Sequence, residues 1–317
     1  MQTSRSFLSH PALKTATVLA VSALALSACT NASETGTSGA ASASGSAAAS
    51  FDPSTVQKDD ALAAMVPEAI KSKGTLTVGS DTSYAPAEFL GTDGQTPVGY
   101  DVDIAKAIGA ALGLKVQVQT AEFTGILPAL GPKYDLGISS FTINPERLAA
   151  VNMVSYYKAG TGWAVRKGNP KKVSLDDLCG KSVGVQTGTV QENPDLSDRN
   201  KKCTAEGKQP INIVTLKNQT DITTRLVNGS IDAMAADSPI VGYALTQTNG
   251  QLEKLGEVYA AAPQGVAVAK TDKALADVIQ KTVTKLMEDG SYKKILDGWG
   301  AADGAITKSE VNPAATS

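Results

Sequence analysis

The order strand, helix, strand occurs twice in this chain, and this repetition constrains the fold more than any other feature. In the first series, a helical pattern over 101–112 lies between apolar segments at 76–78 and 116–118. Ile104 and Ile108 are four residues apart, which places both on one face of that helix. Alternation of this kind predicts an α/β fold with a largely parallel sheet.

The remaining patterns extend this order along the rest of the chain. They are a helix at 61–70, strands at 182–185, 211–214 and 231–235, and helices at 221–227, 275–287 and 292–299. A Gly-Asn-Pro turn at 168–170 and the segment 175–178 lie between the two series. Turn residues of this kind separate structural units, so the pattern predicts a boundary there.

Composition and charge exclude several classes of function. The chain has 317 residues, 42% of them hydrophobic, which is enough for one large core or two medium ones. With 29 basic and 31 acidic residues it lacks the positive field that nucleic acids require, so we expect no nucleic-acid partner. The single histidine, His10, lies in a predicted leader. We therefore expect no histidine-based catalysis, no catalytic residue, no metal site and no cofactor.

The N-terminus has the features of an export signal. Basic residues precede an apolar run at 16–26, which has the length of a signal segment and is too short to span a bilayer as a helix. The run ends in Leu26-Ser27-Ala28-Cys29, which resembles the bacterial lipobox. We therefore predict a lipoprotein signal peptide over 1–28 and a lipidated Cys29 that anchors the protein outside the cytoplasm, on the cell membrane. The alternative is an ordinary secreted or core cysteine.

The segment after this cysteine consists almost entirely of serine, alanine, glycine and threonine as far as residue 50. Such a composition cannot bury enough apolar surface to offset the entropy of ordering. We predict a flexible tether over 29–58, with a mean reach of roughly 25 Å. The alternative is a low-complexity terminus without an anchor.

Two cysteines, Cys179 and Cys203, remain in the exported part. An oxidising compartment favours their pairing, so we expect a disulfide. The alternative is two buried thiols. Two cysteines alone do not make a structural zinc site.

The window around Arg147 has the features of an anion-binding site. Asn144-Pro145-Glu146 predicts a helix start, with an N-cap, a proline at the first position and an acid near the helix dipole. Arg147 then lies in the first turn, close to the hydroxyls of Ser139, Ser140 and Thr142. An arginine fork with hydroxyl groups beside it suits a carboxylate. The alternative is that Arg147 pairs with a surface acid.

Two further segments follow predicted strands. Asp237 ends the strand at 231–235, where ligands of open α/β sheets bind, so its carboxylate could accept hydrogen bonds from a ligand ammonium. As a plain N-cap it would need no ligand. The glycine turn at 186–192 offers backbone N–H groups to an anion. It lacks the Gly-Lys-Ser/Thr end of a P-loop.

These segments together resemble a known family. Asp81–Phe89, Gly99–Ala105, Ser139–Arg147, Val183–Glu192, Asp232–Asp237 and Asp289–Tyr292 are similar, in this order, to the family 3 solute-binding proteins. Members of that family serve ABC importers of polar amino acids. The resemblance covers nearly everything from Gly74 to Gly300.

The resemblance implies a two-lobed α/β fold of the periplasmic-binding-protein type II, with two hinge strands. We place the hinges near 160–165 and 262–268. The first lobe would comprise 59–162 and 266–305, and the second lobe 163–265. A monomer of this kind would deliver its amino acid to the transmembrane subunits of an ABC permease, which works with a cytoplasmic ATPase.

The resemblance also implies roles for individual residues at the two ends of the ligand. Arg147 would bind the α-carboxylate, helped by Thr142 and Thr189. Asp237 and Ser140 would hold the α-ammonium.

The same resemblance assigns a wall to the side-chain pocket, formed by Tyr84 and Phe123. We also count Asp81, Ser139 and Gln186 among the ligand-binding residues. Asp81 and Glu122 are adjacent to wall positions in the sequence, which favours a polar or cationic amino acid such as arginine, lysine, histidine or glutamine. Either acid could instead face solvent, and for Glu122 the two alternatives stay open. At Val190 the sequence departs from the hydroxyl residue that many members carry.

Two alternatives to a binding protein remain. One is a dehydratase that acts on cyclohexadienyl acids on the same fold, with Asp81 or Glu122 as its acid. The other is a lipoprotein that senses a ligand without transport. The complete set of groups for a zwitterion favours a binding protein that is not an enzyme.

Overall fold

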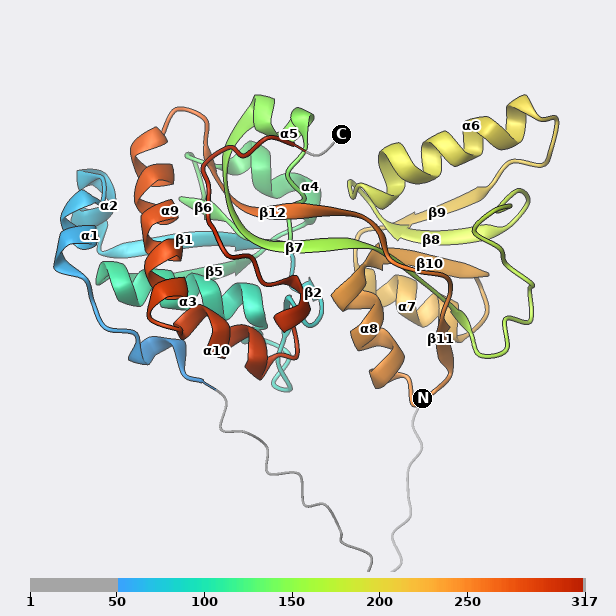
Figure 1. Cartoon of the computed structure of the whole chain (residues 1–317), viewed down its shortest axis with the longest axis horizontal. Helices are drawn as coiled ribbons and strands as arrows, with labels where there is room; N and C mark the ends of the chain where they lie inside the picture. The colour runs from blue at the N-terminus through green and yellow to red at the C-terminus, as the bar shows by residue number, and fades with distance from the viewer. Residues whose placement is uncertain (1–50, 316–317) are drawn as a thin grey trace, which may run out of the picture. The chain divides into compact units, whose positions relative to one another are not determined.

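Two long antiparallel strands, β7 (Val151–Arg166) and β12 (Tyr259–Ala269), connect two α/β lobes (Figure 1). The structure is a computed structural model that describes residues 51–315. The predicted signal peptide, the lipidated Cys29 and the tether up to residue 50 lie outside the described residues. The two-lobed α/β fold with two hinge strands is the fold that the sequence predicts.

The elements in the left-hand part of Figure 1 form the first lobe. Its strands are β1 (Thr75–Ser80), β2 (Ser83–Tyr84), β3 (Glu88–Leu90), β4 (Pro97–Val98), β5 (Lys115–Thr120) and β6 (Leu136–Gly137). Its helices are α1 (Asp60–Met65), α2 (Glu68–Lys73), α3 (Tyr100–Leu112), α4 (Phe123–Ile126), α5 (Pro145–Ala150), α9 (Lys273–Glu288) and α10 (Ser291–Gly298), with short 3₁₀ turns at Pro53–Thr55, Leu127–Ala129 and Ala302–Gly304. β5, β1 and β6 run parallel, and β2, β3 and β4 form a small antiparallel sheet.

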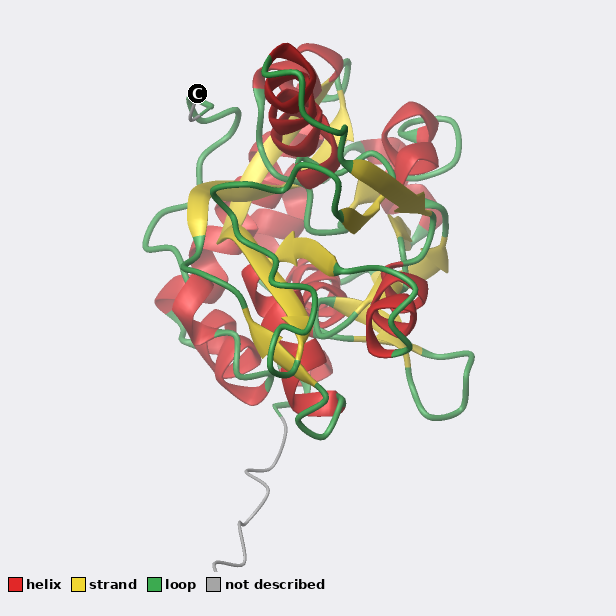
Figure 2. Ribbon diagram, turned by 90° about the vertical axis from the view of Figure 1, so that its right-hand side faces the viewer, coloured by secondary structure: helices red, strands yellow, loops and turns green. Residues whose placement is uncertain are grey.

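The second lobe lies on the other side of the hinge strands. Its elements are β8 (Ser182–Gln186), β9 (Asn212–Leu216), β10 (Ala233–Asp237), β11 (Leu252–Lys254), α6 (Ser197–Ala205), α7 (Gln219–Val227), α8 (Ser238–Gln247) and an irregular helical turn, η3 (Gln191–Leu196). β8 pairs in parallel with β9 and β10, whereas β10 and β11 run antiparallel to β7. Figure 2, viewed from the side of this lobe, shows helices on either side of its strands.

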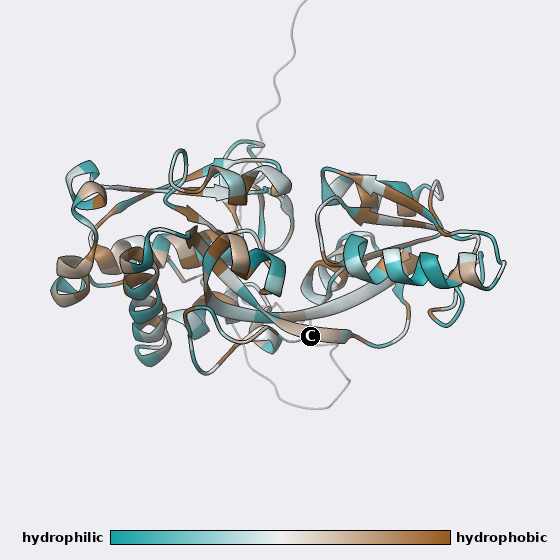
Figure 3. Cartoon of the chain, turned by 90° about the horizontal axis from the view of Figure 1, so that it is seen from above, coloured by the Kyte–Doolittle hydropathy of each residue, from teal (hydrophilic) through white to brown (hydrophobic). Residues whose placement is uncertain are grey.

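Apolar residues of the strands and helices fill the interior of both lobes. Leu76 of β1 and Ile108 of α3 are fully buried in the first lobe, and Trp163 and Val183 are fully buried in the second. In contrast to this apolar interior, the helix α6 at the surface of the second lobe is largely hydrophilic (Figure 3). None of the helices within residues 51–315 is both long and apolar enough to cross a bilayer.

Two sequence-based boundaries differ from the structure. The helix predicted over 61–70 is two helices, α1 and α2, because Pro67 lies between them and lacks a backbone N–H donor. The boundary predicted at 168–178 lies inside the second lobe, where Val173 and Leu178 pack with Trp163. The chain instead crosses between the lobes within β7, because its continuous pairing with β12 and β10 satisfies its backbone on both sides.

We propose that the lobes turn about the middle of these two strands. β12 changes register with β7 between Tyr259 and Ala262, and Ala260 has a positive φ of 50°. This irregularity lies close to the hinges expected near 160–165 and 262–268. The first lobe also continues beyond residue 305, since the backbone of Glu310 pairs with that of Ser155 at 3.0 Å.

Cys179 and Cys203 form the disulfide expected from the sequence, with their Cα atoms 5.6 Å apart. It joins the loop before β8 to α6. A Cys179→Ala/Cys203→Ala variant should lose about 3 kcal/mol of unfolding free energy, because the bond closes a loop in the unfolded chain. Urea titrations of both proteins measure this, and a reductant should destabilise the wild type alone. Equal stability of the two proteins would contradict the prediction.

Candidate ligand-binding site

Nine of the ten residues predicted to bind a ligand line one small pocket between the lobes. They are Tyr84, Phe123, Ser139, Ser140, Thr142, Arg147, Gln186, Thr189 and Asp237. Val190 and Gln191 line it too, and Asp81 does not. The pocket volume is about 10 Å³, which is room for about one water molecule. A larger ligand therefore requires side chains or lobes to move apart.

The topology explains why these residues meet. Parallel strands of both lobes end at the pocket: Ser139 and Ser140 follow β6, while Gln186 and Asp237 end β8 and β10. Ligands of open α/β sheets bind outside the carboxyl ends of strands, because side chains of the following loops converge there. The pocket thus has one wall from each lobe.

Arg147 reaches across the pocket from the first turn of α5. Asn144 is the N-cap, and its side chain accepts a 2.8 Å hydrogen bond from the Arg147 backbone N–H, as the sequence predicts. The guanidinium donates to the carbonyl of Thr142 at 2.8 Å and, across the lobes, to that of Gly188 at 3.1 Å. Both partners are carbonyl oxygens, so neither the expected hydroxyl contacts nor a surface acid holds it. Burial lowers the pKa of Arg147 to about 10, so it stays charged at neutral pH.

Aromatic rings support this guanidinium. Phe123 and Phe141 stack with centroids 4.8 Å apart, and Arg147 lies over both, 5.3 Å and 5.6 Å from their centroids. A cation over aromatic faces is favoured electrostatically. Phe123 therefore both lines the pocket and orients its cation.

Asp237 contributes the opposite charge from the second lobe. It precedes α8, but its side chain makes no capping hydrogen bond there, so the plain N-cap alternative does not hold. The carboxylate accepts from the amides of Gln191 at 2.9 Å and Gln264 at 2.7 Å. Burial raises the pKa of Asp237 to about 6, although the Gln191 amide and the charge of Arg147 favour the ionised form.

The glycine turn after β8 already binds an anion of its own chain. The Gly188 N–H donates to the carboxylate of Glu192, and the Thr189 hydroxyl donates to the carbonyl of Gln186 at 2.7 Å. A ligand carboxylate would therefore have to compete for these donors. The turn is less open to an outside anion than the sequence suggests.

Asp81 lies behind the pocket wall. Its carboxylate accepts from the N–H and hydroxyl of Ser83, from the Phe123 N–H at 2.9 Å and from the Gln186 amide at 3.0 Å. Burial raises its pKa. Gln186 belongs to the second lobe, so this contact spans the lobes and covers Asp81.

Glu122 faces solvent, which settles the alternative left open by the sequence. Its side chain is 59% exposed and pairs with Lys217 at 2.6 Å. This ion pair also joins the two lobes. Glu122 is therefore not part of the pocket.

Two buried acids in contact with the serines were missed from the sequence. Ser139 donates to Glu88 at 2.8 Å, and the Ser140 N–H donates to Asp101 at 2.9 Å. Asp101 lies three residues before Ile104, on the apolar face of α3. An acid on an apolar face is a signal that could have marked it as buried.

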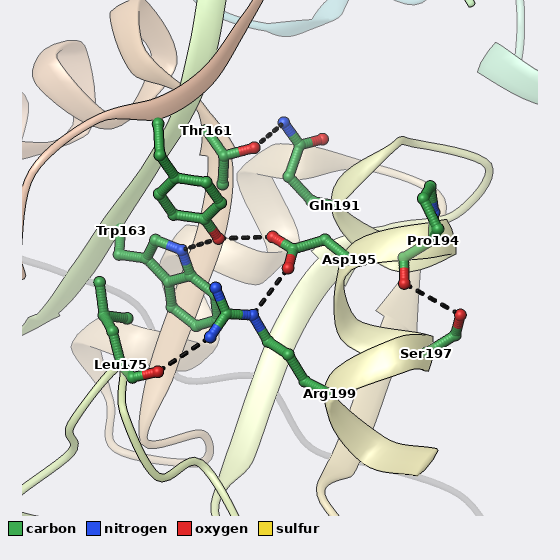
Figure 4. Close-up of polar contacts among 9 residues, drawn as sticks. Thr161, Trp163, Leu175, Gln191, Pro194, Asp195, Ser197 and Arg199 are labelled. Carbon is green, nitrogen blue, oxygen red and sulfur yellow. Dashed lines mark hydrogen bonds and ion pairs between the residues drawn. The ribbon is translucent and has the colours of Figure 1, made fainter. Parts of the chain in front are cut away.

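A second set of contacts that the sequence does not predict holds the turn that carries Gln191 in place. The Gln191 amide donates to Thr161 at 3.3 Å (Figure 4). It also donates to Asp237. Further along η3, Asp195 accepts from Arg199 at 2.7 Å and from the hydroxyl of Tyr259, a residue of β12. The turn beside the pocket is thereby tied to both hinge strands.

One group of potential metal ligands occurs within residues 51–315. It comprises Asp177 and the two cysteines, Cys179 and Cys203. Both sulfurs are bonded to each other in the disulfide, so neither is available as a thiolate.

Comparison with known proteins agrees with this fold. Residues 76–302 match the family of bacterial extracellular solute-binding proteins, family 3. The arginine-binding protein ArgT of Corynebacterium glutamicum is 34% identical over 252 residues, covering 79% of this chain and 82% of that protein. The L-cystine-binding protein TcyJ of Escherichia coli is 28% identical, covering 75% and 86%.

A solved structure shows the same likeness in three dimensions. It is described as an ancestral arginine-binding protein bound to arginine, and it shares 34% sequence identity with a TM-score of 0.65. The match covers 71% of this chain and 98% of that one. Together with the match over residues 76–302, these similarities show that the chain belongs to the bacterial extracellular solute-binding proteins of family 3.

Proposed function

We propose that this protein binds an amino acid as a zwitterion between its two lobes and delivers it to an ABC permease. One observation carries the proposal: Arg147 and Asp237, of opposite charge and from different lobes, line one pocket. Buried charges are costly unless they are paired, and a zwitterion offers a partner to each. A ligand that bridges both stabilises the closed arrangement of the lobes.

The chain's own groups suit the two ends of such a ligand. Arg147 binds the α-carboxylate, and Thr142 and Thr189, whose hydroxyls can assist it, line the same pocket. Thr189 has to turn its hydroxyl away from the Gln186 carbonyl to take part. Asp237 and Ser140 receive the α-ammonium.

The side chain of the ligand is cationic or polar in this proposal, with arginine favoured. Asp81 is a buried carboxylate directly behind Gln186, and a guanidinium that displaces the Gln186 amide would gain a charge-assisted bond. The relatives named as arginine-binding proteins support the same choice. Tyr84 and Phe123 wall this part of the pocket.

A thermal-shift screen of the purified mature protein against the twenty amino acids and ornithine tests the proposal. Arginine or another cationic amino acid should give the largest stabilisation, followed by glutamine, and calorimetry then measures the affinity. Asp81→Ala should weaken binding of a cationic ligand far more than of glutamine, since it removes a charge partner. The proposal fails if branched aliphatic amino acids compete best or if no amino acid binds.

Ligand affinity should fall below about pH 6. Asp237 has a pKa of about 6 and has to be ionised to accept an ammonium. Each pH unit below this value should therefore weaken binding by up to about tenfold, with little change between pH 7 and 8. Calorimetry at pH 5, 6, 7 and 8 measures the trend, and Asp237→Asn should abolish it. A flat profile for the wild type would contradict the assignment.

Without ligand, the same group has the opposite effect on stability. Its pKa in the folded protein is above its ordinary value of 3.8, so the native state binds more protons than the unfolded state between about pH 4 and 6. The contribution of Asp237 to folding is therefore largest at low pH and decreases as the pH rises through 6.

We propose that the ligand is released chemically unchanged. Of the two acids that a dehydratase would use, Glu122 is at the surface and Asp81 accepts four hydrogen bonds. Chromatography of the ligand before and after incubation with the protein tests this. A dehydrated product from a cyclohexadienyl acid would favour the enzyme instead.

We also propose that a diacylglyceryl group on Cys29 anchors the protein to the membrane as a monomer, with the segment that follows as its tether. The position of Cys29 directly after the apolar run supports this. Mass spectrometry of the protein from its native membrane should show a lipidated cysteine at the N-terminus. A mature form that begins elsewhere would contradict the anchor.

A further inference from the structure

Two fully buried carboxyl groups lie directly behind the serines of the pocket. Glu88 of β3 and Asp101 of α3 are both 0% exposed. Both approach the same hydroxyl, that of Ser140, at 3.5 Å and 3.3 Å. Their other contacts are hydroxyl and N–H groups, from Ser139, Ser140 and Tyr156.

Two buried carboxyl groups that both lie within 3.5 Å of one hydroxyl, without a cation between them, cannot both be ionised. Asp101 has the better environment for a negative charge. It accepts from the Tyr156 hydroxyl at 2.7 Å and the Ser140 N–H at 2.9 Å, and it lies in the first turn of α3, where the helix dipole favours an anion. Burial and the charge of Asp101 hold the pKa of Glu88 well above its usual range. Glu88 therefore keeps the proton.

This arrangement determines which way the serine hydroxyls point. A serine hydroxyl has one proton to donate and two lone pairs that accept. Ser139 donates its proton to Glu88, and Ser140 directs its proton to the acid pair. The Ser139 oxygen also accepts from the Asp81 N–H at 3.0 Å. Ser140 lines the pocket, and with its proton directed to the acids its hydroxyl oxygen is left as an acceptor.

Asp101 also holds the backbone of Ser140 in place. Ser140 has a φ of 50°, in the left-handed region that residues other than glycine seldom adopt. Such a conformation persists where surrounding contacts impose it. Here the contact is the hydrogen bond from the Ser140 N–H to Asp101.

We propose that Glu88 and Asp101 act as positioning residues that make the Ser140 subsite an acceptor, and so select an ammonium group over a carboxylate at that end of the ligand. The proposal rests on the proposed function, since it concerns the α-ammonium of the bound amino acid. It adds that one proton, kept on Glu88 behind the pocket, determines the orientation of the ligand.

The first test does not depend on any ligand. The infrared spectrum of the full mature protein at pH 8, where Asp237 is ionised, should contain the band of a protonated carboxylic acid, and Glu88→Gln should remove it. Absence of this band from the wild type, or its survival in Glu88→Gln, would overturn the proposal. A wild type that shows the band but binds no amino acid would confirm the proton on Glu88 and overturn the proposed function, and with it the selection of an ammonium at Ser140.

The second test compares L-arginine with 5-guanidinopentanoate, which lacks the α-ammonium. Asp101→Asn should weaken arginine binding about tenfold or more, the size expected for losing one charge-assisted contact, and change binding of the analogue less than about threefold. Ser140→Ala should give the same pattern if Asp101→Asn does not fold. Equal losses for both ligands would indicate a merely structural role and overturn the proposal.

The third test compares a conservative and a non-conservative substitution of Glu88. A glutamine side chain can accept from Ser139 with its carbonyl, and its amide can donate to Asp101 in the place of the protonated acid. Glu88→Gln should therefore keep the wild-type ratio of the two affinities, whereas Glu88→Ala should reduce it. If Glu88→Gln behaves like Glu88→Ala, Glu88 does not act as a neutral acid.

Discussion

Replacing Arg147 with lysine should weaken amino-acid binding about 100-fold, because the charge is kept but a hydrogen bond between the planar guanidinium and the ligand carboxylate is lost. The guanidinium donates at the same time to Thr142 in its own lobe and to Gly188 in the other, while it lies over two aromatic rings. A lysine ammonium is a point charge and cannot reproduce this planar fork. Calorimetry with the best ligand of the screen measures the loss.

Arg225→Lys is the matched control, because Arg225 is an exposed residue of α7. Its affinity should equal that of the wild type. Unchanged affinity of Arg147→Lys would mean that the α-carboxylate is bound elsewhere. A thermal unfolding curve of each variant without ligand separates lost binding from lost folding.

Asp237→Asn should lower the affinity for the amino acid by a similar factor, about 100-fold, because the ligand ammonium loses its counter-charge. The change has a second cost within the protein. The amides of Gln191 and Gln264 both donate to this carboxylate, and an asparagine offers one oxygen where the aspartate offers two. The amide NH2 of one of the two glutamines would then face the NH2 group of the new asparagine, which is also a donor.

The exposed Asp221 of α7 provides the control, since Asp221→Asn removes the same charge from the same lobe. Competition binding against a ligand without an α-amino group refines the result. Asp237→Asn should leave the affinity for that analogue nearly unchanged. If both ligands lose affinity equally, Asp237 does not contact the ammonium.

The lobes hold each other through several contacts that a ligand has to replace or preserve. The Asp237 N–H donates to the Tyr84 hydroxyl at 3.1 Å, and the Gln219 N–H donates to Ser83 at 3.2 Å. Together with the Gln186 contact to Asp81, these bonds stabilise a closed arrangement. Since the pocket holds about one water molecule in this arrangement, entry of an amino acid requires opening. Rotation at the hinge strands provides that motion in our proposal.

The sequence by itself determined the elements of the fold and the charged ends of the pocket. Periodicity located α3, α7 and α9, because the spacing of apolar residues is a local property. Asn144 marked the start of α5 and hence the position of Arg147. Asp237 was predictable for a similar reason, since the end of a parallel strand is where such a fold places its ligand groups.

Only the tertiary structure decided which polar groups meet. Glu122 and Asp81 are both acids within three residues of a pocket-wall residue, Phe123 and Tyr84 respectively. Yet Glu122 pairs with Lys217 at the surface, and Asp81 is buried under Gln186. Gln264, from the hinge strand β12, reaches Asp237 across a separation of 27 residues. The pairing of Glu88 with Asp101 likewise depends on two elements that pack together.

The physical reason is that burial and hydrogen bonding are not local. The sequence sets which groups can ionise or donate, but the pKa of Glu88 and the direction of the Ser140 hydroxyl depend on neighbours brought in by packing. Local patterns therefore determined the scaffold and the charges of this protein. The positions of their partners, and with them the protonation of the site, were decided by the fold.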